Sequence, residues 1–305
     1  MSYPLEIVTS LEELLKLKYF IQRQVYLPKR TVHTILAGKH SSKLRGRGLD
    51  FEEVRAYVPG DDIRNIDWKV TARKGITYSK VYNEEKERPV FTVIDQQSGM
   101  FFGTQRYVKS VIAAQVAALS GFWTLKKGDR FGGIVFNDTE LEFVSPKRSM
   151  SLIEHYLRLV TDYNQRLPEM PFRSVSVQRL NEVLHRTSMA VTHDYVLTII
   201  SDFSVMDQDT EQLLMSLSRH NDVILVHIYD PFEVALQDKP FIFSDGEYQT
   251  AWKHDKRKAG QLYNEQFTQL KTKLRDLLQK YGIPHLLLDT YSSAEQQLTE
   301  LLKQS

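Results

Sequence analysis

Apolar and polar residues alternate along the chain with a spacing that changes from segment to segment. From Ser10 to Gln24, leucine and isoleucine recur at near-helical spacing, and Ser10 with Glu13 matches a capping box, so this stretch predicts an N-terminal helix. The stretch 29–48 is basic and rich in glycine and serine, as is typical of a loop. Between residues 49 and 87, short extended segments alternate with turns and predict a small β-rich subdomain.

A larger α/β domain is predicted from residue 89 onward. The continuous apolar run Val90–Ile94 is typical of a central parallel strand buried on both faces. Helical and extended patterns then alternate, with a helix expected at 106–127 and strands expected at 130–136, 140–144, 195–201, 223–229 and 285–288. The first two of these strands follow each other closely and predict an antiparallel hairpin. The remaining alternation predicts a mostly parallel sheet with helices on both faces.

These patterns divide the chain into three parts. Residues 1–28 form the N-terminal helix, 29–88 the basic loop with the β-rich subdomain, and 89–305 the α/β domain. Within the last part, residues 241–252 predict a hairpin insertion that turns at Asp245 and Gly246. The expected architecture is therefore a large α/β domain with a small appended subdomain.

Composition narrows the class of protein. The 305 residues, 42% of them hydrophobic, suffice for a sizeable core. The 40 basic and 38 acidic residues nearly cancel, so net charge gives no reason to expect nucleic acid as a partner. Without cysteine, the chain has no disulfide, thiolate nucleophile or sulfur ligand for a metal.

The apolar segments do not predict export or a membrane span. The first thirty residues carry charges among their apolar positions, unlike a signal peptide, and the apolar stretch Val111–Leu125 is shorter than the roughly 20 residues of a spanning helix. We expect a cytoplasmic protein, and peripheral attachment to a membrane partner remains open.

Two aspartates follow predicted strands and are candidates for a site. Asp95 comes at the end of the run that begins at Val90, and Asp202 follows the strand 195–201. Because the carboxyl ends of parallel strands line the ligand crevice of an open α/β sheet, the two carboxylates could face one site. Alternatively, each aspartate caps the helix or turn that follows it.

This arrangement resembles a von Willebrand factor A domain, which implies a Rossmann-like fold and a divalent cation held by an Asp-x-Ser-x-Ser motif and a later aspartate. The matching stretch begins at Asp95, but Gln97 and Gly99 take the places of the two serines. The resemblance therefore implies a degenerate site for Mg²⁺ or Mn²⁺, with candidate ligands Asp95, Gln97, Ser98 and Asp202.

A second and more specific pattern lies upstream. Its residues are Arg55, Tyr57, Pro59, Gly60, Asp61, Asp62, Arg64, Asp67, Trp68 and Arg73. Together they resemble the signature of the bacterial family called domain of unknown function 58, and the resemblance extends over about residues 40–230. It implies an adaptor or chaperone-like partner of MoxR-type AAA+ ATPases and of other A-domain proteins, and no established reaction.

The same residues can be interpreted physically. Arginine and aspartate pair through two hydrogen bonds, Asp67 can cap a short helix that Gly75 ends, and Trp68 can pack the subdomain onto the larger domain. This interpretation makes the segment a structural clasp between the two domains. The other interpretation is direct contact with a partner, and both can hold at once.

The recognisable catalytic patterns are missing from the sequence. It contains no His-Glu-x-x-His helix, no Gly-x-Ser-x-Gly elbow, no Walker sequence and no dinucleotide fingerprint, and the basic loop 39–47 is typical of a solvated loop. The leading hypothesis is a non-enzymatic protein-interaction module. The alternative is a metal-dependent phosphoester hydrolase that uses Asp95 and Asp202, with Asp61 as a further candidate.

Overall fold

The computed structural model describes residues 3–23, 49–84, 88–171, 176–234, 241–244, 249–252, 272, 274–276 and 278–303. The chain divides into a larger unit, Met1–Lys39 with Arg88–Ser305, and a smaller unit, His40–Glu87. The larger unit is therefore built from chain segments on both sides of the smaller one. The basic loop 39–47 and the hairpin turn at residues 245–248 lie outside the described residues.

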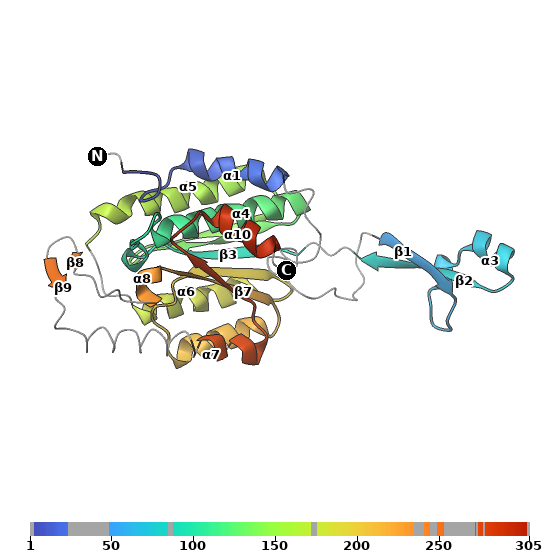
Figure 1. Ribbon diagram of the computed structural model, residues 1–305. Helices are drawn as coiled ribbons and strands as arrows, with labels where there is room; N and C mark the ends of the chain where they lie inside the picture. Colours follow the sequence, from blue (N-terminus) through green and yellow to red (C-terminus); the bar gives the residue numbers. More distant parts are fainter. Residues whose placement is uncertain are drawn as a thin grey trace. The chain divides into compact units, whose positions relative to one another are not determined.

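The larger unit is built on a six-stranded sheet with the order β10-β7-β6-β3-β4-β5 (Figure 1). These strands are β3 (Val90–Asp95), β4 (Phe131–Phe136), β5 (Leu141–Lys147), β6 (Val196–Ser201), β7 (Asp222–Tyr229) and β10 (His285–Asp289). All neighbours run parallel except β4 and β5, which are antiparallel. The prediction of a mostly parallel α/β sheet with an antiparallel hairpin is confirmed.

Helices cover both faces of this sheet (Figure 1). One face packs against α1 (Leu11–Arg23), α4 (Lys109–Lys127), α5 (Met150–Arg166) and α10 (Ala294–Lys303). The other packs against α6 (Val177–Ala190), α7 (Gln208–Ser218) and the side chains of Leu274 and Leu278. Strand residues alternate between the two cores, as with Ile94 and Phe91 of β3, because successive side chains of a strand point to opposite faces.

Helix α4 is the central helix of the first core. The apolar stretch Val111–Leu125 lies within α4, and fifteen residues of this helix are buried. It ends where Gly128 adopts a left-handed conformation with φ of 82°, which glycine accepts without a steric penalty. None of the helices described here has the length and apolar character needed to cross a bilayer.

Helix α4 begins later in the sequence than predicted, because a loop precedes it. The sequence predicted a helix from Arg106, but α4 begins at Lys109. The preceding residues form the short helix η3 (Ser98–Met100) and a loop whose Tyr107 amide donates to the carbonyl of Thr290. This distant contact holds the loop outside the helix.

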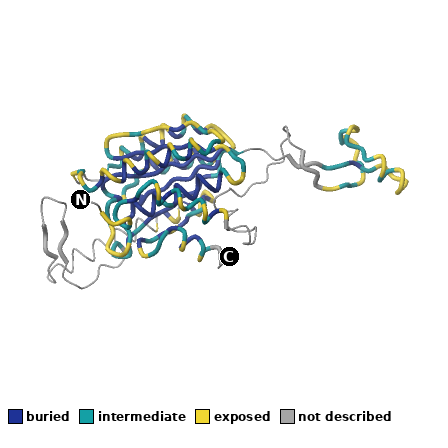
Figure 2. Tube along the Cα trace, turned by 90° about the horizontal axis from the view of Figure 1, so that it is seen from above, coloured by how far each residue is buried: buried dark blue, intermediate teal, exposed yellow. Residues whose placement is uncertain are grey.

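The smaller unit pairs β1 (Leu49–Ala56) with β2 (Tyr78–Glu84) in an antiparallel hairpin. Between these strands lie η2 (Ile63–Asn65) and α3 (Trp68–Lys74). As the sequence predicted, Asp67 caps α3 and Gly75 ends it. Among the side chains described in this unit, Ser79 alone is buried, whereas Figure 2 shows buried residues throughout the larger unit. A two-stranded hairpin with so little core is marginally stable by itself.

A second hairpin consists of β8 (Phe241–Ser244) and β9 (Gln249–Trp252), which pair antiparallel. This agrees with the insertion predicted at residues 241–252. The short helix α8 (Pro231–Val234) precedes it and follows β7 directly.

Candidate functional site

The candidate site lies where the direction of strand order reverses. From β3 the chain forms β4 on one side, and it later returns to place β6 on the other side. Loops that leave neighbouring strands in opposite directions open a crevice at their carboxyl ends. Asp95 ends β3 and Asp202 follows β6, with Ile94 and Ile200 paired in register, so both aspartates reach the same edge of one sheet.

Asp95 is buried and surrounded by hydrogen-bond donors. Its Oδ1 accepts from the Gln97 amide at 2.9 Å, and its Oδ2 accepts from Ser201 Oγ at 2.7 Å and from Gln97 Nε2 at 3.1 Å. Burial and the nearby negative charge of Asp202 nevertheless raise the pKa of Asp95 to about 7. Asp95 therefore exchanges its proton close to neutral pH.

Asp202 belongs to a buried ion cluster with Lys109 and Glu233, which we name the crest triad. Lys109 Nζ donates to Asp202 Oδ2 at 2.7 Å and to Glu233 Oε1 at 2.8 Å. The Lys109 side chain is only 3% exposed. Burial would raise the pKa of Asp202, but the adjacent ammonium holds it below its usual value. Burial would lower the pKa of Lys109, but the two carboxylates raise it. The lysine therefore stays charged.

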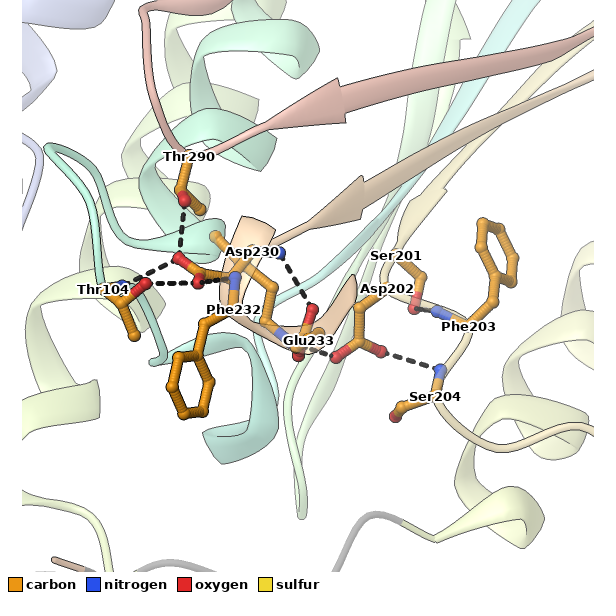
Figure 3. A network of polar contacts seen from close by, with 10 residues as sticks. Thr104, Ser201, Asp202, Phe203, Ser204, Asp230, Phe232, Glu233 and Thr290 are labelled. Atoms are coloured by element: carbon orange, nitrogen blue, oxygen red, sulfur yellow. Dashed lines mark hydrogen bonds and ion pairs between the residues drawn. The ribbon is translucent and has the colours of Figure 1, made fainter. Parts of the chain in front are cut away.

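A second polar cluster next to the triad surrounds Asp230 (Figure 3). This fully buried carboxylate follows β7 and accepts hydrogen bonds from Thr104 Oγ1 at 2.5 Å, Thr290 Oγ1 at 2.6 Å and the Phe232 amide at 2.9 Å. The amide of Asp230 in turn donates to Glu233 Oε2 at 2.8 Å. The loops after β3, β7 and β10 are thus joined, and Glu233 links this cluster to the crest triad.

The other two predicted metal ligands are Ser98 and Gln97. Ser98 is hydrogen-bonded to another residue, and Gln97 has one side-chain oxygen without a hydrogen-bond partner among the described residues. Ser98 donates to Asp138, in the turn between β4 and β5, from its amide at 2.8 Å and from its Oγ at 3.2 Å. Gln97 is buried, and its Oε1 has no hydrogen-bond partner among the described residues. Gly99 has no side chain to offer.

These residues do not fit the divalent cation that the A-domain resemblance implies. Mg²⁺ and Mn²⁺ need several well-placed oxygen ligands. Here Ser201 and Gln97 donate to Asp95, an ammonium is paired with Asp202, and Gln97 Oε1 is a single oxygen. Within the described part of the chain, no three histidine, aspartate or glutamate side chains are grouped so that they could hold a metal ion.

The signature residues found in the sequence all lie in the smaller unit. Arg55 pairs with Asp61 at 2.8 Å, and Arg64 pairs with Asp62 at 2.9 Å. Asp61 also accepts the Val58 amide at 3.1 Å, across the turn formed by Pro59 and Gly60. These ion pairs stabilise the turns of the smaller unit itself. A clasp between the two units remains a prediction.

Three further residues of the site were missed by sequence reasoning. Asp230 directly follows a strand, as Asp95 does, and this repeated position could have identified it. Lys109 stands at the start of a mostly apolar helix, where the helix dipole disfavours a cation. That misplacement was a signal that Lys109 needs acidic partners. Glu233 gave no signal, because its role depends on the fold of the loop after β7.

Relatives were found among curated proteins. Proteins of Mycobacterium bovis and Mycobacterium tuberculosis described as uncharacterized are 28% identical over 215 residues, which cover 69% of this chain. The match spans 64% of the length of these relatives.

Solved structures with a similar arrangement include a conserved hypothetical protein, BatB, from Bacteroides thetaiotaomicron, with 9% identity and a TM-score of 0.40. An aerotolerance-related membrane protein from Bacteroides fragilis has 11% identity and the same TM-score. Each match covers 72% of this chain and 100% of the other. With TM-scores of 0.40, these matches support no conclusion about this chain.

The family assignment rests on a longer match. The family model described as protein of unknown function DUF58 matches residues 53–273, which include all ten signature residues, the Asp95 and Asp202 strand ends and the crest triad. The chain belongs to the DUF58 family.

Proposed function

We propose that the protein is a non-enzymatic interaction module that acts in the cytoplasm as an adaptor or chaperone-like partner of a MoxR-type AAA+ ATPase. The observation that carries this proposal is the exposed apolar surface of the smaller unit. Trp68 is 69% exposed and Ile63 is 67% exposed, in a unit that buries only Ser79 among its described side chains. Large exposed apolar side chains, aromatic ones in particular, are typical of a protein-binding surface.

Helix α3 gives this surface its charge. Its exposed residues Trp68 and Ala72 lie four positions apart, next to Lys69 and Arg73, so they share one side of the helix. We name these four residues the α3 face. No ion pair found among the described residues involves Lys69 or Arg73, whereas Asp67 caps the helix. An acidic segment with apolar residues would complement the α3 face.

A protein segment complements this unit better than nucleic acid does. Besides Trp68, the smaller unit exposes the aliphatic residues Val58, Ile63 and Ile76. Aliphatic side chains contribute to protein interfaces but have no role in phosphate binding. The net charge of +2 for the whole chain also gives no general attraction to nucleic acid.

We further propose that the larger unit is a von Willebrand factor A-type domain that serves as a scaffold. Supporting this are the strand order β10-β7-β6-β3-β4-β5, the single antiparallel edge strand, and an aspartate at the end of β3. The hydrolase alternative gains no such support, because Lys109 already pairs with Asp202 and Glu233. Among the residues that the structure describes, no group of carboxylates is placed to hold a metal ion.

Capture of the ATPase tests the proposal. The tagged full-length chain would be mixed with a purified MoxR-type AAA+ ATPase of the same organism, and bound ATPase measured. We expect capture by the wild type and at least about a tenfold loss, roughly 1.4 kcal/mol, for Trp68→Ala and for the double variant Lys69→Glu/Arg73→Glu. Tyr291→Ala, which removes an aromatic residue that is 67% exposed on the larger unit, is the matched control.

The outcomes separate the two parts of this proposal. Failure of the wild type to bind any such ATPase would remove the assigned partner. Undiminished capture by both α3-face variants would keep the partner and exclude this docking surface. Circular dichroism of each variant would verify that the fold is retained.

A further inference from the structure

We propose that the ammonium group of Lys109 takes the place of a divalent cation at the carboxyl end of the sheet, so that this end of the molecule is held together without metal. The proposal concerns the larger unit alone and does not depend on the α3 face. It rests on the geometry of the crest triad and on the misfit between the described residues and a metal ion.

The ammonium group of Lys109 lies in a position suited to a cation. Lys109 Nζ lies 2.7 Å from Asp202 Oδ2 and 2.8 Å from Glu233 Oε1, and 5.6 Å from the centre of the Phe102 ring. Two carboxylates and the face of an aromatic ring all attract a cation. With Lys109 and Asp202 both buried, removal of the lysine would leave the two acids buried without compensation.

The crest triad also joins three separate elements of the larger unit. Lys109 begins α4, Asp202 follows β6, and Glu233 lies in α8 after β7. A bound cation joins ligands from separate loops in the same way. A lysine differs from an ion because it is part of the chain, so it cannot be removed by a chelator or exchanged with solvent.

The charge of Lys109 opposes the binding of a second cation. A divalent cation next to Asp202 would approach a buried ammonium, and like charges repel strongly where water is excluded. Binding such an ion would require Lys109 to leave its pocket and both carboxylates to change partners. Consequently, a partner's carboxylate cannot bind at this end of the sheet by completing the coordination of a metal ion.

Metal titration of the wild type and of Lys109→Ala tests this inference. We expect the Tm of the wild type to be the same in EDTA, Mg²⁺ and Mn²⁺, and calorimetry with Mn²⁺ to show no binding. Lys109→Ala should have a lower Tm that millimolar Mn²⁺ raises, because the ion restores positive charge between Asp202 and Glu233. The double variant Lys109→Ala/Asp202→Ala is the control, and its Tm should not respond to Mn²⁺.

The wild-type measurement alone can overturn the inference. Stoichiometric Mn²⁺ binding to the wild type that is lost in Asp202→Asn would show that the lysine does not replace a metal ion. If Lys109→Ala does not fold in the absence of metal, recovery of folded protein on expression with Mn²⁺ is the expected result. A Tm of Lys109→Ala equal to that of the wild type would also contradict the inference.

Discussion

Asp95 shows how one buried carboxyl group can make stability depend on pH. Its pKa in the folded protein, about 7, lies above the ordinary value of 3.8, because burial and Asp202 disfavour the charged form. Folding therefore favours the protonated form. The stabilisation from this group is complete below its unfolded pKa and is lost as the pH rises through about 7.

Asp95→Asn should remove this pH dependence. We expect the variant to have a flatter free energy of unfolding between about pH 5 and 8, and to gain on the order of 2 kcal/mol over the wild type at about pH 8. The new amide can donate to Gln97 Oε1, which has no hydrogen-bond partner among the described residues, after the Gln97 side chain flips. Denaturant unfolding over this pH range provides the measurement.

An exposed aspartate serves as the control for this experiment. Asp209→Asn alters an exposed side chain in the first turn of α7, so it should leave the pH dependence unchanged. A wild-type stability that is constant across the range would contradict the assigned role of Asp95.

The candidate site could be predicted from sequence only in part. Asp95 and Asp202 were found because an acid directly after a buried strand has a fixed place in an open sheet. The partner of Asp202 was not found, since Lys109 is 93 residues away along the chain and the two meet only through packing. Ser98 was expected beside Asp95, but Asp138 in the neighbouring turn binds it.

Among the elements, α1 shows how a terminal helix contributes to the larger core. Leu14 is fully buried and Ile21 is 5% exposed, and both belong to the core formed with α4 and α5. Lys126 also donates to the carbonyl of Ile21 at 2.6 Å, which ties the end of α1 to α4. This helix therefore belongs energetically to the sheet domain, although the smaller unit separates them in sequence.

Leu14→Ala should destabilise the larger unit markedly. Removal of a fully buried leucine side chain leaves a cavity and costs roughly 2–5 kcal/mol of unfolding free energy. Tyr19→Ala in the same helix removes a side chain that is 64% exposed and should cost far less. Thermal and denaturant unfolding of both variants would measure the difference, and equal effects would show that α1 does not pack on the core.

Most elements of the larger unit followed from the sequence for a physical reason. Buried parallel strands appear as continuous apolar runs, and β3, β4 and β6 are buried at every position. Boundaries set by distant contacts were harder to predict. The loop before α4 is fixed by Thr104, which bonds to Asp230 far along the chain, and such contacts leave no local pattern.

At the scale of the whole molecule, the two units should differ in how readily their hydrogen bonds open. In the larger unit, β3 and β6 lie inside a sheet covered on both faces, whereas the smaller unit buries only Ser79 among its described side chains. We expect the amides of β1 and β2 to exchange with deuterium faster than those of β3 and β6, because little packing opposes their opening.

Exchange measured by mass spectrometry on the full chain would test this difference. Added ATPase should slow exchange in α3 while β3 remains as it was, if the α3 face is the docking surface. Equal protection of β1 and β3 in the isolated chain would instead indicate that the smaller unit is stabilised by contacts beyond its own residues.

In the sequence, the smaller unit interrupts the larger one, and this constrains the order in which the larger unit can fold during synthesis. Helix α1 leaves the ribosome before its packing partners α4 and α5, which begin only at Lys109 and Met150. Because synthesis proceeds from the amino terminus, Leu14 remains exposed to solvent until the smaller unit and the helices that bury it have been synthesised. During synthesis, the apolar side of this amphipathic helix is therefore accessible to chaperones, whereas it is buried in the folded protein.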